Sequence, residues 1–189
     1  MKTLLASALA TALLVTLCPT VPAADDDDPK PMSERDKERM HKRNKREADT
    51  AWARDKKKMK RDEFAQMEKD YQEINDKYRN PEIMEIIERF LKKYKKGNRV
   101  GCAKMYLAQK KGSRGKDLLE EVIEDHSDAY YLNGCSVGGL ARLYLASQYK
   151  RSGDDRKAKK LVGEIENEYA TAQDQRGNPI VEQARKLVK

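Results

Sequence analysis

An internal repeat is the feature that most constrains how this chain can fold. Residues 101–108 read GCAKMYLA and residues 139–146 read GLARLYLA, and five of the eight positions are identical. Each copy leads through a polar turn that contains glycine into a second segment whose apolar residues recur at helical spacing. Such self-similarity predicts an array of helix pairs, in which each pair buries its apolar face against the next.

Apolar spacing elsewhere also favours an all-α fold. Because aromatic residues make up 6% of the chain and charged residues 38%, helices with wet faces are favoured over a large sheet core. Only 129–132 could form a short strand. From Pro81 onward the chain reads as a series of helices, expected from Pro81 to Gly97, at about 98–111, 113–125, 136–151 and 154–170, and from Asn178 to the end.

The second copy of the repeat resembles a tetratricopeptide repeat. Leu145 and Ala146 form the large and small pair of the first helix, and Tyr149 follows one turn later. Gly153 makes the turn between the helices, and Ala158 is the small residue where they cross. The resemblance covers about residues 98–170, and it implies an α-solenoid of antiparallel helix pairs.

The match departs from the family pattern in the first copy. Lys111 stands where the tyrosine is expected, and Leu118 stands where the small alanine is expected. The two copies are offset by 38 residues, compared with about 34 in the family. Despite these departures, the resemblance leads us to assign residues 81–189 to one tetratricopeptide-like domain.

The resemblance implies that the protein acts by holding a partner protein. In this family, the concave face formed by the first helix of each pair usually carries the binding. The candidate residues on that face are Lys104, Tyr106, Arg142, Tyr144 and Gln148. We therefore expect a scaffold or adaptor without enzymatic activity or a cofactor.

The N-terminus predicts export. Residues 1–23 combine Lys2, an apolar run from Leu4 to Leu17 and small residues ending at Ala23, which is the pattern of a cleaved signal peptide. Residues 24–32 form an acidic linker that contains proline and predicts no packed structure. The mature protein is expected to be soluble, in the periplasm or secreted.

A charged stretch, residues 33–79, precedes the repeat domain. It contains neither glycine nor proline from Ser33 to Tyr78, so we predict one long helix. Its first half has no apolar rhythm and is expected to project into water. Its second half carries apolar residues three and four apart, which is typical of a coiled-coil seam. A homodimer could form through Phe64, Met67, Tyr71, Ile74 and Tyr78.

The first half of this stretch is also basic. Between Ser33 and Asp62 there are 13 Lys and Arg residues against seven Asp and Glu residues. Such a stripe can bind acidic polymers or lipid head groups, although many opposite charges at helical spacing favour a solvated, salt-bridged helix instead. The candidate polyanion-binding residues are Lys56, Lys57, Lys58, Lys60 and Arg61.

Residues 134–138 read GCSVG and fit the G-x-S-x-G pattern of serine hydrolases. That mechanism needs a histidine after the serine, and none follows Ser136. The matching segment at Gly101 begins a helix without a serine, so Ser136 is better explained as a helix cap. We predict no catalytic residue and no metal site.

The mature chain keeps two cysteines, Cys102 and Cys135. An oxidising compartment would allow them to form a disulfide. Two small buried apolar side chains would fit the sequence equally well. The choice between these alternatives stays open at this point.

Overall fold

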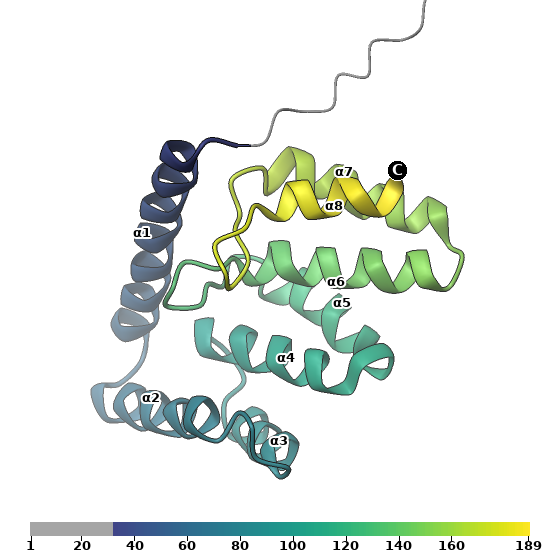
Figure 1. Cartoon of the computed structure of the whole chain (residues 1–189). Helices are drawn as coiled ribbons and strands as arrows, with labels where there is room; N and C mark the ends of the chain where they lie inside the picture. Colours follow the sequence, from purple (N-terminus) through teal and green to yellow (C-terminus); the bar gives the residue numbers. More distant parts are fainter. Residues whose placement is uncertain (1–31) are drawn as a thin grey trace, which may run out of the picture. The chain divides into compact units, whose positions relative to one another are not determined.

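The computed structural model describes residues 32–189, and the predicted signal peptide and most of the linker lie outside the described residues. Within 32–189 the regular elements are helices, which confirms the all-α fold class, and the two isolated β-bridges belong to loops. Figure 1 shows the α-helices α1 (Glu34–Lys58), α2 (Arg61–Asp76), α3 (Ile83–Lys93), α4 (Asn98–Lys111), α5 (Lys116–Asp125), α6 (Val137–Arg151), α7 (Asp155–Glu168) and α8 (Ile180–Val188); a 3-10 helix, Gly112–Gly115, joins α4 to α5.

Helices that follow one another in the chain pack together from α2 to α8. The even-numbered helices also contact one another: α2 touches α4, α4 touches α6 and α6 touches α8. The shared core is apolar, and burial of this kind stabilises the fold by roughly 25 cal/mol per Å² of apolar surface. Its largest fully buried side chains include Met67, Ile74, Ile87, Met105, Leu119, Ile165 and Ile180.

The predicted single helix over residues 33–79 is wrong, because the chain forms two helices there. Met59 has an extended backbone, with φ −100° and ψ 155°, and it separates α1 from α2. Figure 1 shows α2 running at a steep angle to α1. The two helices pack on different surfaces, since α2 contacts α3 and α4 while α1 reaches the loops before α6 and α8. One straight helix could not serve both surfaces.

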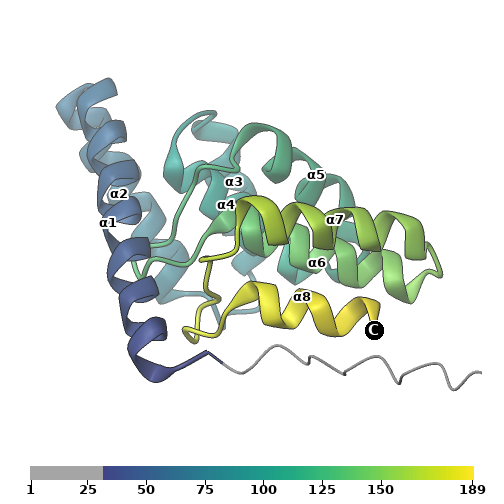
Figure 2. The same cartoon turned by 90° about the horizontal axis from the view of Figure 1, so that it is seen from above.

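The first half of the stretch does not project into water, contrary to expectation. Helix α1 lies across the ends of α4, α6 and α8 (Figures 1 and 2). The side-chain amide of Asn44, on α1, donates from Nδ2 to the carbonyl oxygen of Thr171 at 2.8 Å. Asp55 Oδ2 accepts the backbone N–H of Asn98 at 2.5 Å, and so caps α4. The buried face consists of Met40, Asn44, Ala48, Ala51 and Asp55.

Two connecting segments, 129–137 and 172–180, share one backbone design. Each turns back on itself through a glycine in the left-handed region, Gly134 at φ 88° and Gly177 at φ 82°. The predicted short strand at 129–132 is reduced to a single bridge in the first of these segments. The matching bonds are Tyr131 N to Cys135 O (3.0 Å) and Asp174 N to Asn178 O (2.9 Å), then Val137 N to Ala129 O (3.0 Å) and Ile180 N to Ala172 O (2.9 Å).

The predicted dimer seam is used inside the chain. Met67 and Ile74 are 0% exposed, and the half-buried Tyr78 packs against the same core. Phe64 meets Trp52 of α1 edge-to-face, with 5.3 Å between ring centroids, and Tyr71 meets Phe90 of α3 at 5.9 Å. The seam therefore offers no free apolar face to a second copy. None of the helices between residues 32 and 189 combines the length and apolar character that crossing a membrane requires.

Candidate partner-binding groove

Two neighbouring hollows lie along α2, α4, α6 and α8, with volumes of about 330 Å³ and 290 Å³. Gln175 lines both, so the two hollows adjoin at this residue, and we call them together the groove. The first hollow is lined by Tyr71, Asn75, Arg99, Tyr106, Tyr131, Leu132, Asn133 and Gln175. The second is lined by Gln109, Leu140, Leu143, Tyr144, Asp174, Gln175, Arg176 and Gln183.

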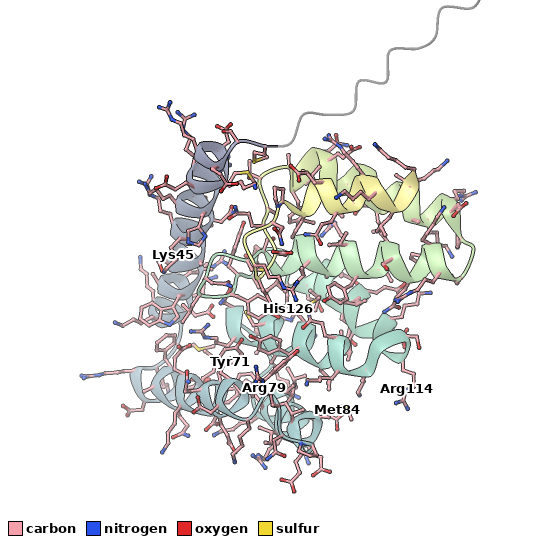
Figure 3. All side chains as sticks on the ribbon, in the orientation of Figure 1. Lys45, Tyr71, Arg79, Met84, Arg114 and His126 are labelled. Carbon is pink, nitrogen blue, oxygen red and sulfur yellow. The ribbon has the colours of Figure 1, made fainter. Side chains whose placement is uncertain are left out.

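Tyrosine rings form the wall of the first hollow. Tyr71 and Tyr106 lie parallel, with 6.5 Å between centroids and 9° between planes, and Figure 3 places Tyr71 between α2 and α4. Tyr131 packs on Tyr106 at 4.9 Å. Ring contacts of this kind stabilise by about 0.5–1.5 kcal/mol beyond the area that they bury. The three rings therefore form a rigid packed cluster, in which Tyr71 and Tyr131 are buried and Tyr106 is partly exposed.

Arg99 fixes this wall from within. Its guanidinium lies over the Tyr71 ring, 4.7 Å from the centroid. Two parallel bonds of 2.7 Å join its Nε and Nη2 to the carboxylate of Glu68. The side chain of Arg99 is 3% exposed, so Glu68 neutralises a charge that water does not reach. Such bidentate pairs hold their geometry firmly, and the hollow gains rigidity without net charge.

The tyrosine hydroxyls stay protonated in the groove. Burial raises the pKa of Tyr71 well above its ordinary value and that of Tyr106 to about 12. The hydroxyl of Tyr71 is buried and has no hydrogen-bond partner within residues 32–189. The Cys102 thiol lies beside it but donates to the carbonyl oxygen of Tyr130, at 3.4 Å. Tyr71 and Tyr106 are thus neutral phenols at physiological pH.

Several side-chain amides line the groove, beside leucines and the charged Asp174 and Arg176 of the second hollow. Each amide carries one acceptor and two donor positions, which is the complement that a peptide main chain requires. The side chains of Asn75, Gln109 and Gln175 make no hydrogen bond within the described part of the chain. Gln183 is held by Asp174, with 2.9 Å from Nε2 to Oδ2. The groove therefore keeps unused hydrogen-bonding capacity beside an aromatic wall.

Only two of the five predicted partner-binding residues reach the groove, namely Tyr106 and Tyr144. Arg142 turns inward, where its Nε meets Glu164 Oε2 at 2.9 Å, and Lys104 pairs with Glu121 at 2.9 Å. Gln148 donates to the carbonyl oxygen of Gly112 at 3.0 Å. Residues two apart on a helix do not share a face, so the basic residues point away from the tyrosines that follow them.

Several groove residues were missed from the sequence because they lie on connecting segments. Tyr131, Asn133 and Gln175 belong to the two glycine turns that precede α6 and α8. The signal was present as a second internal match, in which Ala129, Gly134 and the helix start recur 43 residues later as Ala172, Gly177 and the next helix start. Helical periodicity does not detect such a loop repeat.

The remaining predicted residues lie outside the groove. Lys56, Lys57, Lys58, Lys60 and Arg61 are all exposed around the break between α1 and α2. Ser136 caps α6, as predicted, because its Oγ accepts the N–H of Gly139 at 3.2 Å. Among residues 32–189, no group of three or more His, Cys, Asp or Glu side chains is placed to hold a metal ion.

The two cysteines are separate thiols in the structure, so the disulfide is not formed there. Both side chains are buried, with Cys102 at 0% and Cys135 at 1% exposure. Burial raises the pKa of Cys102 to about 12 and also raises that of Cys135. The thiolate is the reactive form of cysteine, so both side chains act here as apolar packing residues.

We compared the chain with known protein families, curated proteins and solved structures. No protein-family model, no curated protein and no solved structure matches the chain.

Proposed function

We propose that the protein is an exported, tetratricopeptide-like scaffold that holds a partner protein in the groove. The observation that carries the proposal is the groove itself, in which free side-chain amides stand beside tyrosine rings over two adjoining hollows. Aromatic side chains supply large contact area, and amides pair with main-chain N–H and C=O groups. The occupant that fits this chemistry is an extended polypeptide segment.

Helix packing supports the solenoid part of the proposal. The helices pair in chain order, and their first members are in contact, since α4 touches α6 and α6 touches α8. Gly153 turns the chain between α6 and α7 at φ 80°, and Ala158 is 0% exposed where those helices meet. These are the positions at which the family pattern requires a glycine and a small residue.

Export rests on the sequence of residues 1–23. Its test is the N-terminus of the mature protein, which should begin at Ala24 if the signal is cut after Ala23. An uncut N-terminus in the cell interior would contradict this part of the proposal. The groove would keep its chemistry in either compartment.

Site-specific photo-crosslinking tests the groove directly. A photoreactive phenylalanine analogue at Tyr144, which is 41% exposed in the second hollow, should cross-link a discrete partner in the native host. The matched control carries the same analogue at Met84, which is 38% exposed on α3 and lines no hollow of the groove. We expect products from the Tyr144 position only.

A double variant completes the test. Tyr144→Ala with Gln175→Ala removes one aromatic surface and one free amide, and neither side chain makes a hydrogen bond within residues 32–189. We expect at least about a tenfold loss of partner affinity, because burying an aromatic side chain contributes about 1.5–3 kcal/mol. Equal cross-linking at positions 144 and 84, or undiminished affinity of the double variant, would refute the groove.

A further inference from the structure

A larger cleft, of about 690 Å³, lies on a different part of the molecule from the groove. It opens between the end of α1, the connection from α3 to α4, and the turn after α5. We call it the corner cleft. The basic side chains that line it are Arg54, Lys58, Lys95, Lys96 and Lys104.

Exposed cations without a salt bridge gather in and beside the corner cleft. Salt bridges engage much of the charged surface elsewhere, for example Lys77 with Glu73 and Lys111 with Glu88. Within residues 32–189, no salt bridge reaches seven exposed cations at this corner. Lys95 Nζ donates to the carbonyl oxygen of Leu91 at 3.0 Å, and Lys56 lies over the Trp52 ring at 5.3 Å. The seven, which we call the corner cations, are Lys56, Lys57, Lys58, Lys60, Arg61, Lys95 and Lys96.

Two of the four acidic side chains that line the cleft are already engaged. Asp128 pairs with Arg54 at 2.7 Å, and Asp55 accepts the N–H of Asn98. Glu63 and Asp125 also line the cleft, and no salt bridge to them is formed among the described residues. The two carboxylates without a salt bridge therefore lie in the cleft beside Lys58, Lys95 and Lys96, and the other four corner cations add positive charge next to it in the chain, around the break between α1 and α2. Positive potential remains, and it gathers at a hollow that can hold a ligand.

The fold brings the two groups of cations together. Lys56 to Arg61 form one run in the sequence, whereas Lys95 and Lys96 follow about 35 residues later, just before α4. Lys58 and both later lysines line the same cleft. The sequence alone predicts only a basic stripe on a helix.

We propose that the corner cleft binds a linear polymer that carries phosphate or sulfate groups at intervals, with the corner cations as its contacts. The spread of point charges over a helix break and a loop suits a flexible chain of anions. This inference does not rest on the groove, and the two sites can be occupied separately.

A membrane surface fits this corner less well. Lys58, Lys95 and Lys96 line a hollow, which a flat lipid surface cannot enter. Insertion would also require exposed apolar side chains nearby. The large apolar side chains exposed within residues 32–189 are Met84, Leu132 and Tyr144, and none of them lines the corner cleft.

The test uses the full mature chain and two probes, a fluorescent inorganic polyphosphate and a sulfated polysaccharide. Binding is measured by anisotropy over a series of NaCl concentrations. Lys95→Gln with Lys96→Gln should weaken binding by about fivefold at low salt and reduce the salt slope by about 1.4, since each contact to a single strand contributes about 0.7. The groove variant Tyr144→Ala should bind both probes unchanged.

Matched controls separate a site from overall charge. Lys159→Gln with Lys186→Gln removes two exposed cations that form no salt bridge and lie on α7 and α8. That pair should change affinity by less than about twofold, because distant exposed charges are screened. Lys95→Arg with Lys96→Arg should bind like the natural protein.

Three outcomes would overturn the proposal. Equal weakening by the control pair would show that binding follows net charge alone. No binding to either polymer at low salt would remove the site. Equal or tighter binding to vesicles of anionic lipid would assign the corner to a membrane. Preference between the two polymers identifies whether phosphate or sulfate is the natural group.

Discussion

Helices α1 and α2 come from one charged stretch of the chain, yet they attach to the rest of the protein in different ways. Helix α2 buries Phe64, Met67, Tyr71 and Ile74, which are large and apolar. Helix α1 buries two alanines, one methionine, an asparagine and an aspartate. The first attachment depends on apolar area, and the second depends on close approach and hydrogen bonds to loop backbones.

This difference explains which helix could be placed from sequence. Large apolar residues three and four apart mark a buried face whatever covers it. A face of alanine, asparagine and aspartate has the same spacing but carries no hydrophobic signal. Small and polar faces therefore escape a search that scores only apolar periodicity, even when they are as fully buried.

The largest expected effect comes from the apolar attachment. Ile74→Ala should lower the free energy of unfolding by about 2–5 kcal/mol, because it leaves a cavity at a side chain that is 0% exposed. Urea denaturation measures the change. Lys69→Ala, at an exposed position of the same helix, is the control and should stay within about 0.5 kcal/mol. Equal losses would mean that α2 is not held by its apolar face.

A glycine pair tests the attachment of α1. Gly134 and Gly177 occupy equivalent turns, and alanine at either position should cost about 1–2 kcal/mol because the backbone is left-handed there. Only at Gly134 would the new Cβ also meet the α1 backbone, 2.9 Å from Asn44 C and Lys45 N; at Gly177 nothing lies within 4 Å. Gly134→Ala should therefore be the more destabilising, by urea denaturation.

Hydrogen exchange distinguishes the cause. Gly134→Ala should speed amide exchange throughout α1, whereas Gly177→Ala should leave α1 protected. Equal exchange in the two variants would show that α1 does not depend on its close approach to the 129–137 segment.

The smallest effect concerns pH. Burial raises the pKa of Asp55 above its ordinary 3.8, with the Asn98 N–H opposing the shift. The folded state then holds the proton more tightly than the unfolded state, so this group favours folding below pH 3.8 and loses that contribution as pH rises through the folded pKa. As pH rises from 3.8 through the folded pKa, the natural protein should therefore lose stability relative to Asp55→Asn.

Urea denaturation of both proteins at several pH values from 3 to 7 measures this difference in stability. Groups that change protonation in both proteins contribute equally, so their effect cancels. A natural protein that gains stability over Asp55→Asn as pH rises would reverse the sign. It would mean that the bond to Asn98 outweighs the desolvation of the carboxylate.

Much of the fold was predictable from α3 onward. The bounds of α4 agree with expectation, and those of α6 and α7 lie within two residues of it. Helices α4 and α6 are rich in small and apolar residues on most faces, α7 carries its apolar residues on one face, and Gly97, Gly112 and Gly153 mark turns beside them. The break at Met59 could not be predicted from local signals, because the segment around it contains good helix formers and neither glycine nor proline. Tertiary packing decides its position.

The groove was predictable only in part. Tyr106 and Tyr144 were identified because the repeat aligns them. Tyr71 was assigned to a dimer seam, since its periodicity gives a buried face but not the identity of what covers it. Tyr131 and Gln175 depend on how two loops fold back over the helices, and helical spacing carries no information on that.

The position of α1 also sets an order of events when the chain folds. Two of its hydrogen bonds, from Asn44 Nδ2 to Thr171 O and from Gln173 Nε2 to Lys37 O, span 127 and 136 residues. Neighbouring helix pairs close short loops and can form early, whereas contacts this distant carry a larger loop-closure entropy. Helix α1 leaves the ribosome before every other described helix, yet it gains its last partners only after the segment before α8 has been made.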